Sequence, residues 1–179
     1  VRSRRFGDVY KTQRSVPGQK VGAPNFRLDD VTALCTQLAG IEAVAPQVSK
    51  SMTVVANGRN WQTSVVGTNT DYFTIDNRTF EDGRNFEEAE ERAGSAVCVI
   101  GSTVANELFG TTQNVVGRQI RTGGFSCRVI GLLKTKGTAA MGGDQDDLLV
   151  MPLKSVQRRI LGGNRVSALL IRINADSDR

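Results

Sequence analysis

The sequence of 179 residues contains no histidine. Histidine is the side chain that most often serves as a general base near neutral pH, and it is the commonest zinc ligand. Its absence excludes Ser-His and Cys-His catalytic pairs and leaves only carboxylates or lysines as candidate bases. No segment gives a reason for one carboxylate to be desolvated. We therefore predict no catalytic residues and no enzymatic activity in this chain.

Cysteine is scarce, and its spacing excludes the common metal and redox motifs. The three cysteines are Cys35, Cys98 and Cys127, and none of them forms a C-x-x-C pair. Each falls inside a segment predicted to be a helix or a strand. Two interpretations stay open: small buried hydrophobic side chains, which we favour, or a disulfide between Cys98 and Cys127.

Long apolar segments are also missing. No run of 18 apolar residues occurs, so no segment is predicted to span a bilayer. Residues 1–7 lack the apolar core of a signal peptide. The content of 39% hydrophobic residues is enough for the core of one large or two small domains. We expect a soluble chain, with any membrane spans lying outside it.

The formal charge of +5 raises the possibility of nucleic-acid binding. The cationic residues are dispersed, however, and cluster only at residues 2–5 and at Arg158-Arg159. One Trp and two Tyr leave few side chains on which bases could stack. The sequence therefore predicts no nucleic-acid partner.

Hydrophobic spacing predicts two helices with one apolar stripe each, at residues 30–39 and 153–161, the first capped by Asp29. Asn57-Gly58 is among the strongest two-residue indications of a β-hairpin. Short helices are predicted at 71–75, 86–92 and 102–108, the last capped by Ser102. Strands are predicted at 9–15, 42–49, 52–56, 62–67, 96–100, 116–121, 125–133, 148–151 and 166–173.

This order of elements predicts an α+β fold with a discontinuous subdomain. Strand, helix and strand occur at both ends of the chain, and matching βα units usually pair their strands in one sheet. We assign residues 1–50 and 148–179 to a split βαβ subdomain and residues 51–147 to an inserted small α/β subdomain rich in hairpins. Both long helices should lie on one face of a sheet that contains strands 42–49 and 166–173.

The segment 137–147 is rich in glycine and aspartate. It lacks the Gly-Lys-Ser/Thr ending of a phosphate-binding loop, and it lacks the central Gly and bidentate Glu of an EF-hand. We therefore predict no metal and no cofactor here. Glycine and carboxylates together favour a solvated loop of low local stability.

Several motifs together carry a resemblance to a known family. Val99-Ile100-Gly101 and Val129-Ile130-Gly131, two strand ends of one design, flank the short helix predicted at 102–108. The run from Val65 to Phe73, the turn Asp82-Gly83-Arg84-Asn85-Phe86, Lys136-Gly137 before Asp144-Gln145-Asp146-Asp147, and Pro152-Leu153 accompany them in order. Over residues 28–173 the sequence resembles the periplasmic core domain of MacB-like ABC transporter permeases.

The resemblance implies an extracytoplasmic domain on the periplasmic side of the inner membrane, anchored by flanking helices outside this chain. It implies a porter-like split subdomain, truncated at its C-terminal end, and a parent permease that works as a homodimer with ATPase activity located elsewhere. Partners would be a periplasmic adaptor protein and an outer-membrane duct, for export of an antibiotic, peptide, toxin or lipid. The candidate partner-contact loop is Asp144, Gln145, Asp146 and Asp147. The alternative is a lipoprotein-releasing or FtsX-type permease domain that docks a chaperone or a cell-wall hydrolase.

Overall fold

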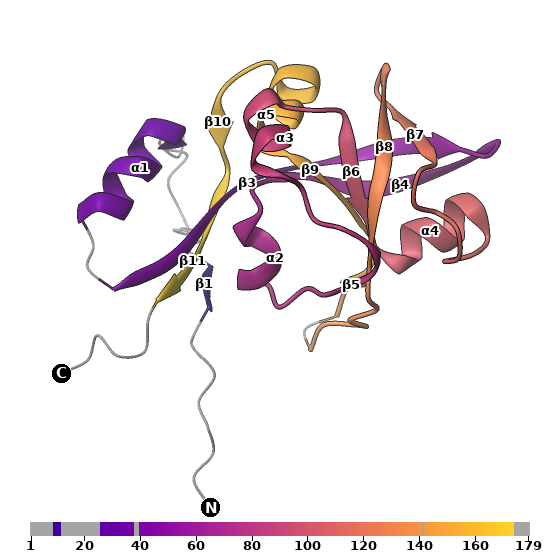
Figure 1. The fold of residues 1–179 in the computed structure, drawn as a ribbon, viewed down its shortest axis with the longest axis horizontal. Helices are drawn as coiled ribbons and strands as arrows, with labels where there is room; N and C mark the ends of the chain where they lie inside the picture. Colours follow the sequence, from indigo (N-terminus) through magenta and orange to yellow (C-terminus); the bar gives the residue numbers. More distant parts are fainter. Residues whose placement is uncertain (1–8, 12–25, 38–39, 141, 174–179) are drawn as a thin grey trace, which may run out of the picture.

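The longest element is a single strand, β3 (Ile41–Ala56), which runs through the whole domain (Figure 1). The computed structural model describes residues 9–11, 26–37, 40–140 and 142–173. Within them the fold is mixed α/β, with one large sheet, a two-stranded sheet and short helices. The other strands are β1 (Val9–Lys11), β2 (Phe26–Arg27), β4 (Arg59–Thr68), β5 (Phe80–Gly83), β6 (Val97–Ile100), β7 (Gln119–Thr122), β8 (Phe125–Leu133), β9 (Leu148–Pro152), β10 (Arg165–Val166) and β11 (Ala168–Ile173). The helices are α1 (Leu28–Gln37), α2 (Asp71–Ile75), α3 (Glu88–Ala93), α4 (Ser102–Phe109), α5 (Leu153–Val156) and the π-helix η1 (Gln157–Leu161).

The predicted hairpin at Asn57-Gly58 is confirmed. Ala56 pairs with Arg59, so the turn between β3 and β4 has only two residues. Asn57 and Gly58 have φ angles of 52° and 70°. Positive φ at both central positions matches the right-handed twist of the two strands, which is why this dipeptide favours tight hairpins.

The prediction of separate strands at 42–49 and 52–56 is wrong, because β3 continues through residues 50 and 51. Ser49, Lys50 and Ser51 are all exposed, and three polar residues in a row suggest a break between strands. They are held extended by their pairing with Val66, Val65 and Ser64 of β4. The predicted division of the chain at residue 50 therefore coincides with no turn, and the two subdomains stay a prediction.

Six strands pair in a closed ring. β3 pairs with β4, β4 with β9, β9 with β6, β6 with β8, β8 with β7, and β7 returns to β3 through Val54 opposite Thr122. The inside is filled by side chains, as in other small barrels. Helix α4 packs against this ring and adds Val104, Ala105 and Leu108 to the same core. The strand residues of this core are Val48, Val54, Ala56, Val65, Cys98, Ile100, Ile120, Cys127, Val129, Leu132, Leu149 and Met151.

A second core lies on the outer face of the ring, under α2. Successive residues of four strands alternate between the two cores, because side chains in a strand point to opposite faces. The alternating pairs are Val65 and Val66, Cys98 and Val99, Val129 and Ile130, and Leu149 and Val150. Burial on both faces explains the uninterrupted apolar runs of these strands. In this second core the phenyl group of Phe73 on α2 packs against two others, with centroid distances of 5.1 Å to the phenyl group of Phe80 and 5.7 Å to that of Phe86.

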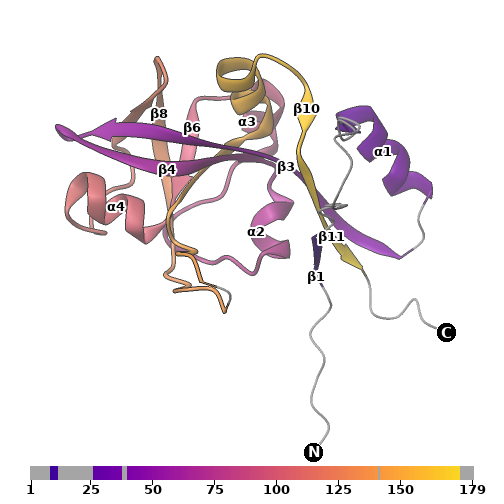
Figure 2. The same ribbon diagram turned by 180° about the vertical axis from the view of Figure 1, so that it is seen from behind.

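The sheet extends beyond the ring at one end. β11 pairs antiparallel with β3, and β1 pairs with β11. The prediction that strands 42–49 and 166–173 share a sheet is therefore confirmed. The second predicted strand is interrupted at Ser167, because β10 pairs with β2 in a small separate sheet. Figures 1 and 2 show β10 lying between α1 and the helix formed by α5 and η1.

Two predicted helix caps and the type of one helix differ from the prediction, and the helix predicted at 86–92 is found at Glu88–Ala93. Asp29 lies inside α1, which begins at Leu28. Gly101, not Ser102, is the N-cap of α4, and Ser102 is a buried helical residue whose hydroxyl accepts a hydrogen bond from the Thr135 hydroxyl. The helix from Leu153 continues as a π-helix after Val156. The predicted strand residues 12–15, helix residues 38–39 and the side chains of Val31, Leu34 and Cys35 lie outside the described part.

The two Val-Ile-Gly motifs also differ from each other. Gly101 directly follows the last residue of β6, so the first motif marks a strand end as predicted, whereas Gly131 lies inside β8 and is not a strand end. A Cβ at Gly101 would overlap the carbonyl oxygen of Asp146, so this position needs glycine for close packing. Within the described ranges, no helix is long and apolar enough to cross a membrane.

Candidate partner-contact loop and an adjoining groove

The predicted contact residues lie in the loop between β8 and β9, and its described residues form a small hairpin. Thr138 pairs with Asp144 across an isolated bridge. The Ala139 amide donates to the Gly143 carbonyl at 3.0 Å, and the Gln145 amide donates to the Gly137 carbonyl at 3.1 Å. These bonds give the loop a defined shape.

Asp146 fixes the base of this hairpin. Its side chain is buried, with the residue 3% exposed, and its two oxygens accept the amides of Lys136 at 2.8 Å and Gly137 at 3.0 Å. Nη1 of Arg78 lies 3.7 Å from its Oδ1. A carboxylate can be buried when hydrogen bonds and an opposite charge replace water. The expectation of a fully solvated loop is therefore wrong at Asp146.

Arg78 and Asp76 connect this hairpin to the end of α2. Nε of Arg78 donates to Oδ2 of Asp76 at 2.8 Å, and the Arg78 side chain is only 6% exposed. Nζ of Lys136 lies 3.7 Å from the same Asp76 oxygen. Two loops far apart in the sequence are thus joined by one network of charges.

Asp147 is also a structural residue. Its Oδ1 accepts hydrogen bonds from Nε1 of Trp61 at 3.0 Å and from Oγ1 of Thr63 at 2.7 Å. Both donors belong to β4, the parallel neighbour of β9. This carboxylate therefore fixes the start of β9 against β4.

Asp144 is the exposed carboxylate of the predicted set. One oxygen accepts the amide of Asp146, and the other accepts the hydroxyl of Thr103 on α4. Gln145 is half-buried. The four residues therefore have different roles: Asp146 and Asp147 hold the base of the hairpin, whereas Asp144 belongs to its exposed end together with Gly142 and Gly143, which is called the tip below.

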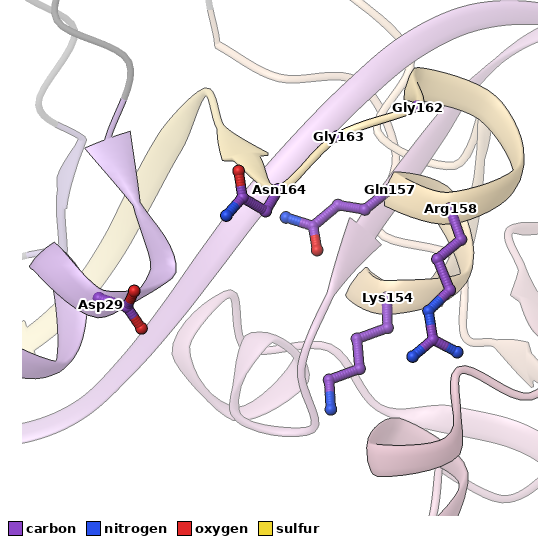
Figure 3. A pocket seen from close by; sticks show the side chains of 7 residues that line it. All are labelled: Asp29, Lys154, Gln157, Arg158, Gly162, Gly163 and Asn164. Carbon is purple, nitrogen blue, oxygen red and sulfur yellow. The ribbon is translucent and has the colours of Figure 1, made fainter.

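A groove that the sequence did not predict lies between α1 and the helix α5–η1 (Figure 3). Its volume is about 460 Å³. Asp29 stands on one wall and Lys154 and Gln157 on the other. Nζ of Lys154 donates to the Arg92 carbonyl at 3.1 Å and Arg158 donates to the Ala93 carbonyl at 3.3 Å, so these cations also cover the end of α3. The full lining is Asp29, Lys154, Gln157, Arg158, Gly162, Gly163 and Asn164.

Three groups with shifted pKa values lie on α2 and α3 and not in the β8–β9 hairpin. Burial raises the pKa of Tyr72 to about 12. The bidentate hydrogen bond from Arg84 lowers the pKa of Glu90, while desolvation raises the pKa of Glu91. In the ranges that the structure describes, no three His, Cys, Asp or Glu side chains are grouped so that they could hold a metal ion.

Comparison with known sequences places this fold among transporter domains. The MacB-like periplasmic core domain family matches residues 2–179. The macrolide export ATP-binding/permease protein MacB of Bdellovibrio bacteriovorus is 36% identical over 151 residues, which are 84% of this chain and 23% of that protein. The pyoverdine export ATP-binding/permease protein PvdT of Pseudomonas entomophila is 33% identical over 138 residues, 76% of this chain and 21% of that protein.

Solved structures show the same fold. The periplasmic region of MacB from Actinobacillus actinomycetemcomitans superposes with a TM-score of 0.75 at 22% identity, covering 88% of this chain and 69% of that one. The extracellular domain of the ABC-type transporter YknZ from Gram-positive bacteria superposes with a TM-score of 0.73 at 20% identity, covering 95% and 84%.

Fold and sequence together define the class as the extracytoplasmic domain of an ABC transporter permease. The chain belongs to the MacB-like periplasmic core domain family, over nearly its whole length. It spans only about a quarter of the length of the curated MacB relative from Bdellovibrio bacteriovorus.

Proposed function

We propose that this domain transmits ATP-driven motion across the membrane, so that the permease that contains it exports a substrate. The named relatives export a macrolide or pyoverdine, and an antibiotic, peptide, toxin or lipid is the corresponding substrate class here. A rigid domain moved by its membrane anchors can change the contacts or volume of a cavity between two copies. This mechanical role requires a rigid domain and does not require reactive side chains.

The observation that supports this role is the continuity of β3. The first part of this strand, residues 41–47, pairs with β11, and residues 48–56 pair with β4 and, at Val54 and Val55, with β7 of the ring. A displacement applied at the β11 end therefore reaches the ring through an unbroken hydrogen-bonded strand. A packed interior of low compressibility transmits strain in the same way.

We also propose that the exposed tip of the β8–β9 hairpin contacts a periplasmic adaptor protein, which in turn joins an outer-membrane duct. The support is the arrangement of the carboxylates: Asp146 and Asp147 hold the base, and Asp144 stays exposed on a positioned loop. Surface loops held by a rigid scaffold are common binding elements. The same fold occurs in a domain from Gram-positive bacteria, so the fold by itself does not imply an adaptor or an outer-membrane duct.

The β3 proposal can be tested by softening the strand where no side chain is buried. Lys50→Gly combined with Ser51→Gly should make residues 49–51 more flexible, because each glycine costs roughly 0.5–1 kcal/mol of backbone order. The matched control is Lys50→Ala with Ser51→Ala. In the full-length permease we expect ATP hydrolysis in liposomes to persist and efflux of a macrolide or of pyoverdine from cells to fall. Unchanged efflux, despite faster hydrogen exchange in β3, would contradict the proposal.

The loop proposal needs a change of charge at the surface. Asp144→Lys should reduce efflux more than Asp144→Ala, because both changes remove the hydrogen bonds from the Asp146 amide and the Thr103 hydroxyl but only the first adds a positive charge. Gln119→Lys on exposed β7 is the control for an added surface charge. Full efflux with Asp144→Lys would show that the tip makes no productive contact. Cross-linking of a chaperone or a cell-wall hydrolase at this tip, in place of an adaptor, would support a lipoprotein-releasing or FtsX-type permease.

A further inference from the structure

The two described cysteines face each other inside the ring of strands. Sγ of Cys98 on β6 lies 2.6 Å from Sγ of Cys127 on β8. Both side chains are buried in the same core, with exposed fractions of 0% and 1%. Both are free thiols in this structure.

The strand register accounts for this contact. β6 and β8 run parallel, and Cys98 lies opposite Val129. Cys127 is two residues before Val129, so its side chain points to the same inner face and is the diagonal neighbour of Cys98. The two sulfur atoms meet with both strands in place, and no change of pairing is needed to join them.

We propose that Cys98 and Cys127 form a disulfide in the mature protein. Each thiol gives up its proton and the pair gives up two electrons, so that one S–S bond replaces two S–H bonds. The oxidant is a disulfide, supplied by a dithiol–disulfide oxidoreductase of the extracytoplasmic compartment and reduced to two thiols by exchange. The compartment rests on the family assignment and the proposed function, whereas the contact between the sulfurs does not.

Burial decides when this bond can form. Desolvation, followed by the neighbouring Cys127 thiol, raises the pKa of the Cys98 thiol well above its ordinary value. The thiolate is the species that attacks a disulfide, and it is therefore scarce once the ring has closed. Oxidation should therefore accompany the pairing of β6 with β8, before the rest of the core closes over both thiols, and the completed bond is then shielded from reductants.

The disulfide would also join the two ends of the segment 99–126. Residues 99–126 contain α4 and β7, and β7 closes the ring on β3 through two residue pairs. A cross-link between Cys98 and Cys127 reduces the conformational entropy of this segment when it is unfolded. The disulfide therefore stabilises the part of the domain in which β7 closes the ring of strands.

The test uses the full-length protein made in cells and inserted in its membrane. Free thiols are alkylated with iodoacetamide in denaturant at lysis, and the digest is analysed by mass spectrometry without reduction. We expect a cross-linked peptide pair that contains Cys98 and Cys127, with alkylation at Cys35. Cys98→Ser should leave Cys127 alkylated, and Cys35→Ser should leave the cross-link intact. Alkylation of both Cys98 and Cys127 in the wild-type protein overturns the proposal.

Reduction kinetics provide a second measurement that needs no variant. Dithiothreitol should reduce the bond in the native protein more slowly than in urea, by more than about tenfold, because reduction requires the ring to open. Equal rates would contradict a buried bond at this position.

Failure of the disulfide and failure of the proposed function can be distinguished. Refolding the reduced protein with oxidised glutathione tests the geometry independently of location. A bond formed there and absent from the membrane-inserted protein overturns the mature disulfide and leaves export unaffected. A bond present in a protein that exports nothing keeps the disulfide and overturns the proposed function.

Discussion

Arg78 and Asp146 face each other between two loops, with Nη1 of the guanidinium 3.7 Å from Oδ1 of the carboxylate and both side chains at most 6% exposed. Asp146 also accepts two backbone amides of the β8–β9 loop. Arg78 has a closer partner in Asp76, at 2.8 Å, so the two backbone amides are the hydrogen bonds that depend on the Asp146 carboxylate alone. This relationship makes Asp146 a structural residue at the base of the candidate contact loop.

We expect Asp146→Asn to lower the free energy of unfolding by about 1–3 kcal/mol, because the Asn side chain has one acceptor oxygen in place of two and leaves a buried backbone amide of Lys136 or Gly137 without a partner. Urea unfolding followed by Trp61 fluorescence measures this change. Asp144→Asn is the control, since Asp144 is exposed and its replacement should cost less than about 1 kcal/mol. Equal effects of the two substitutions would show that the buried network contributes no special stability.

The neighbouring carboxylates Glu90 and Glu91 should respond to pH in opposite directions. Hydrogen bonds from Arg84 lower the folded-state pKa of Glu90, so its stabilisation is present near neutral pH and is lost as pH falls through that lowered pKa. Desolvation raises the folded-state pKa of Glu91, so stability from its protonated form is present at acid pH and is lost as pH rises through that pKa.

Glu90→Gln should therefore destabilise the domain by about 0.5–1 kcal/mol at neutral pH, with the difference from wild type shrinking in acid. Glu91→Gln removes a desolvated charge. The stability of this variant relative to wild type should therefore be highest at neutral pH, where Glu91 of the wild type is ionised. Urea midpoints measured across the acid range give both curves. Parallel curves for the two variants would contradict the assigned shifts.

Gly101→Ala tests the close packing of the first Val-Ile-Gly motif. A methyl group there would meet the carbonyl oxygen of Asp146, and overpacking of this kind costs roughly 1–3 kcal/mol. The φ angle of Gly101 is −80°, so backbone strain does not contribute. Gly163→Ala is the matched control, because nothing lies within 4 Å of a Cβ at that position. A thermal midpoint of Gly101→Ala equal to that of the control would disprove the packing argument.

The sequence correctly predicted those turns and strands that are determined by residues close together in the chain. Asn57-Gly58 specified its turn because both residues tolerate positive φ, and the apolar runs at 97–100 and 148–151 indicated buried strands. The continuity of β3 was missed because the polar residues 49–51 interrupt the hydrophobic pattern. Their extended conformation comes from pairing with β4, which the pattern of β3 itself does not contain.

Features that depend on distant partners were not predictable in the same way. The ring closes where Val54 meets Thr122, residues far apart in the chain. The burial of Asp146 depends on Arg78, which comes from another loop, so a cluster of aspartates among glycines gave the wrong expectation of a solvated loop. Cys98 and Cys127 could be listed as a possible pair from sequence, but only the register of β6 and β8 brings their sulfurs together.

We predict that the isolated domain is monomeric or only weakly dimeric, although the permease that contains it should act as a dimer. In the proposed mechanism, membrane helices and nucleotide-binding domains hold the two copies together, while the extracytoplasmic domains separate and close. Transient interfaces of this kind bury less than about 1,200 Å² in total. Among the described residues with burial values, the exposed large apolar side chains are Val55, Leu161 and Ile173, and they belong to three different elements, β3, η1 and β11. Sedimentation velocity at micromolar concentration should show a monomer. A stable dimer there would mean that this domain itself drives association, and the mechanism would then have to rest on a fixed extracytoplasmic pair.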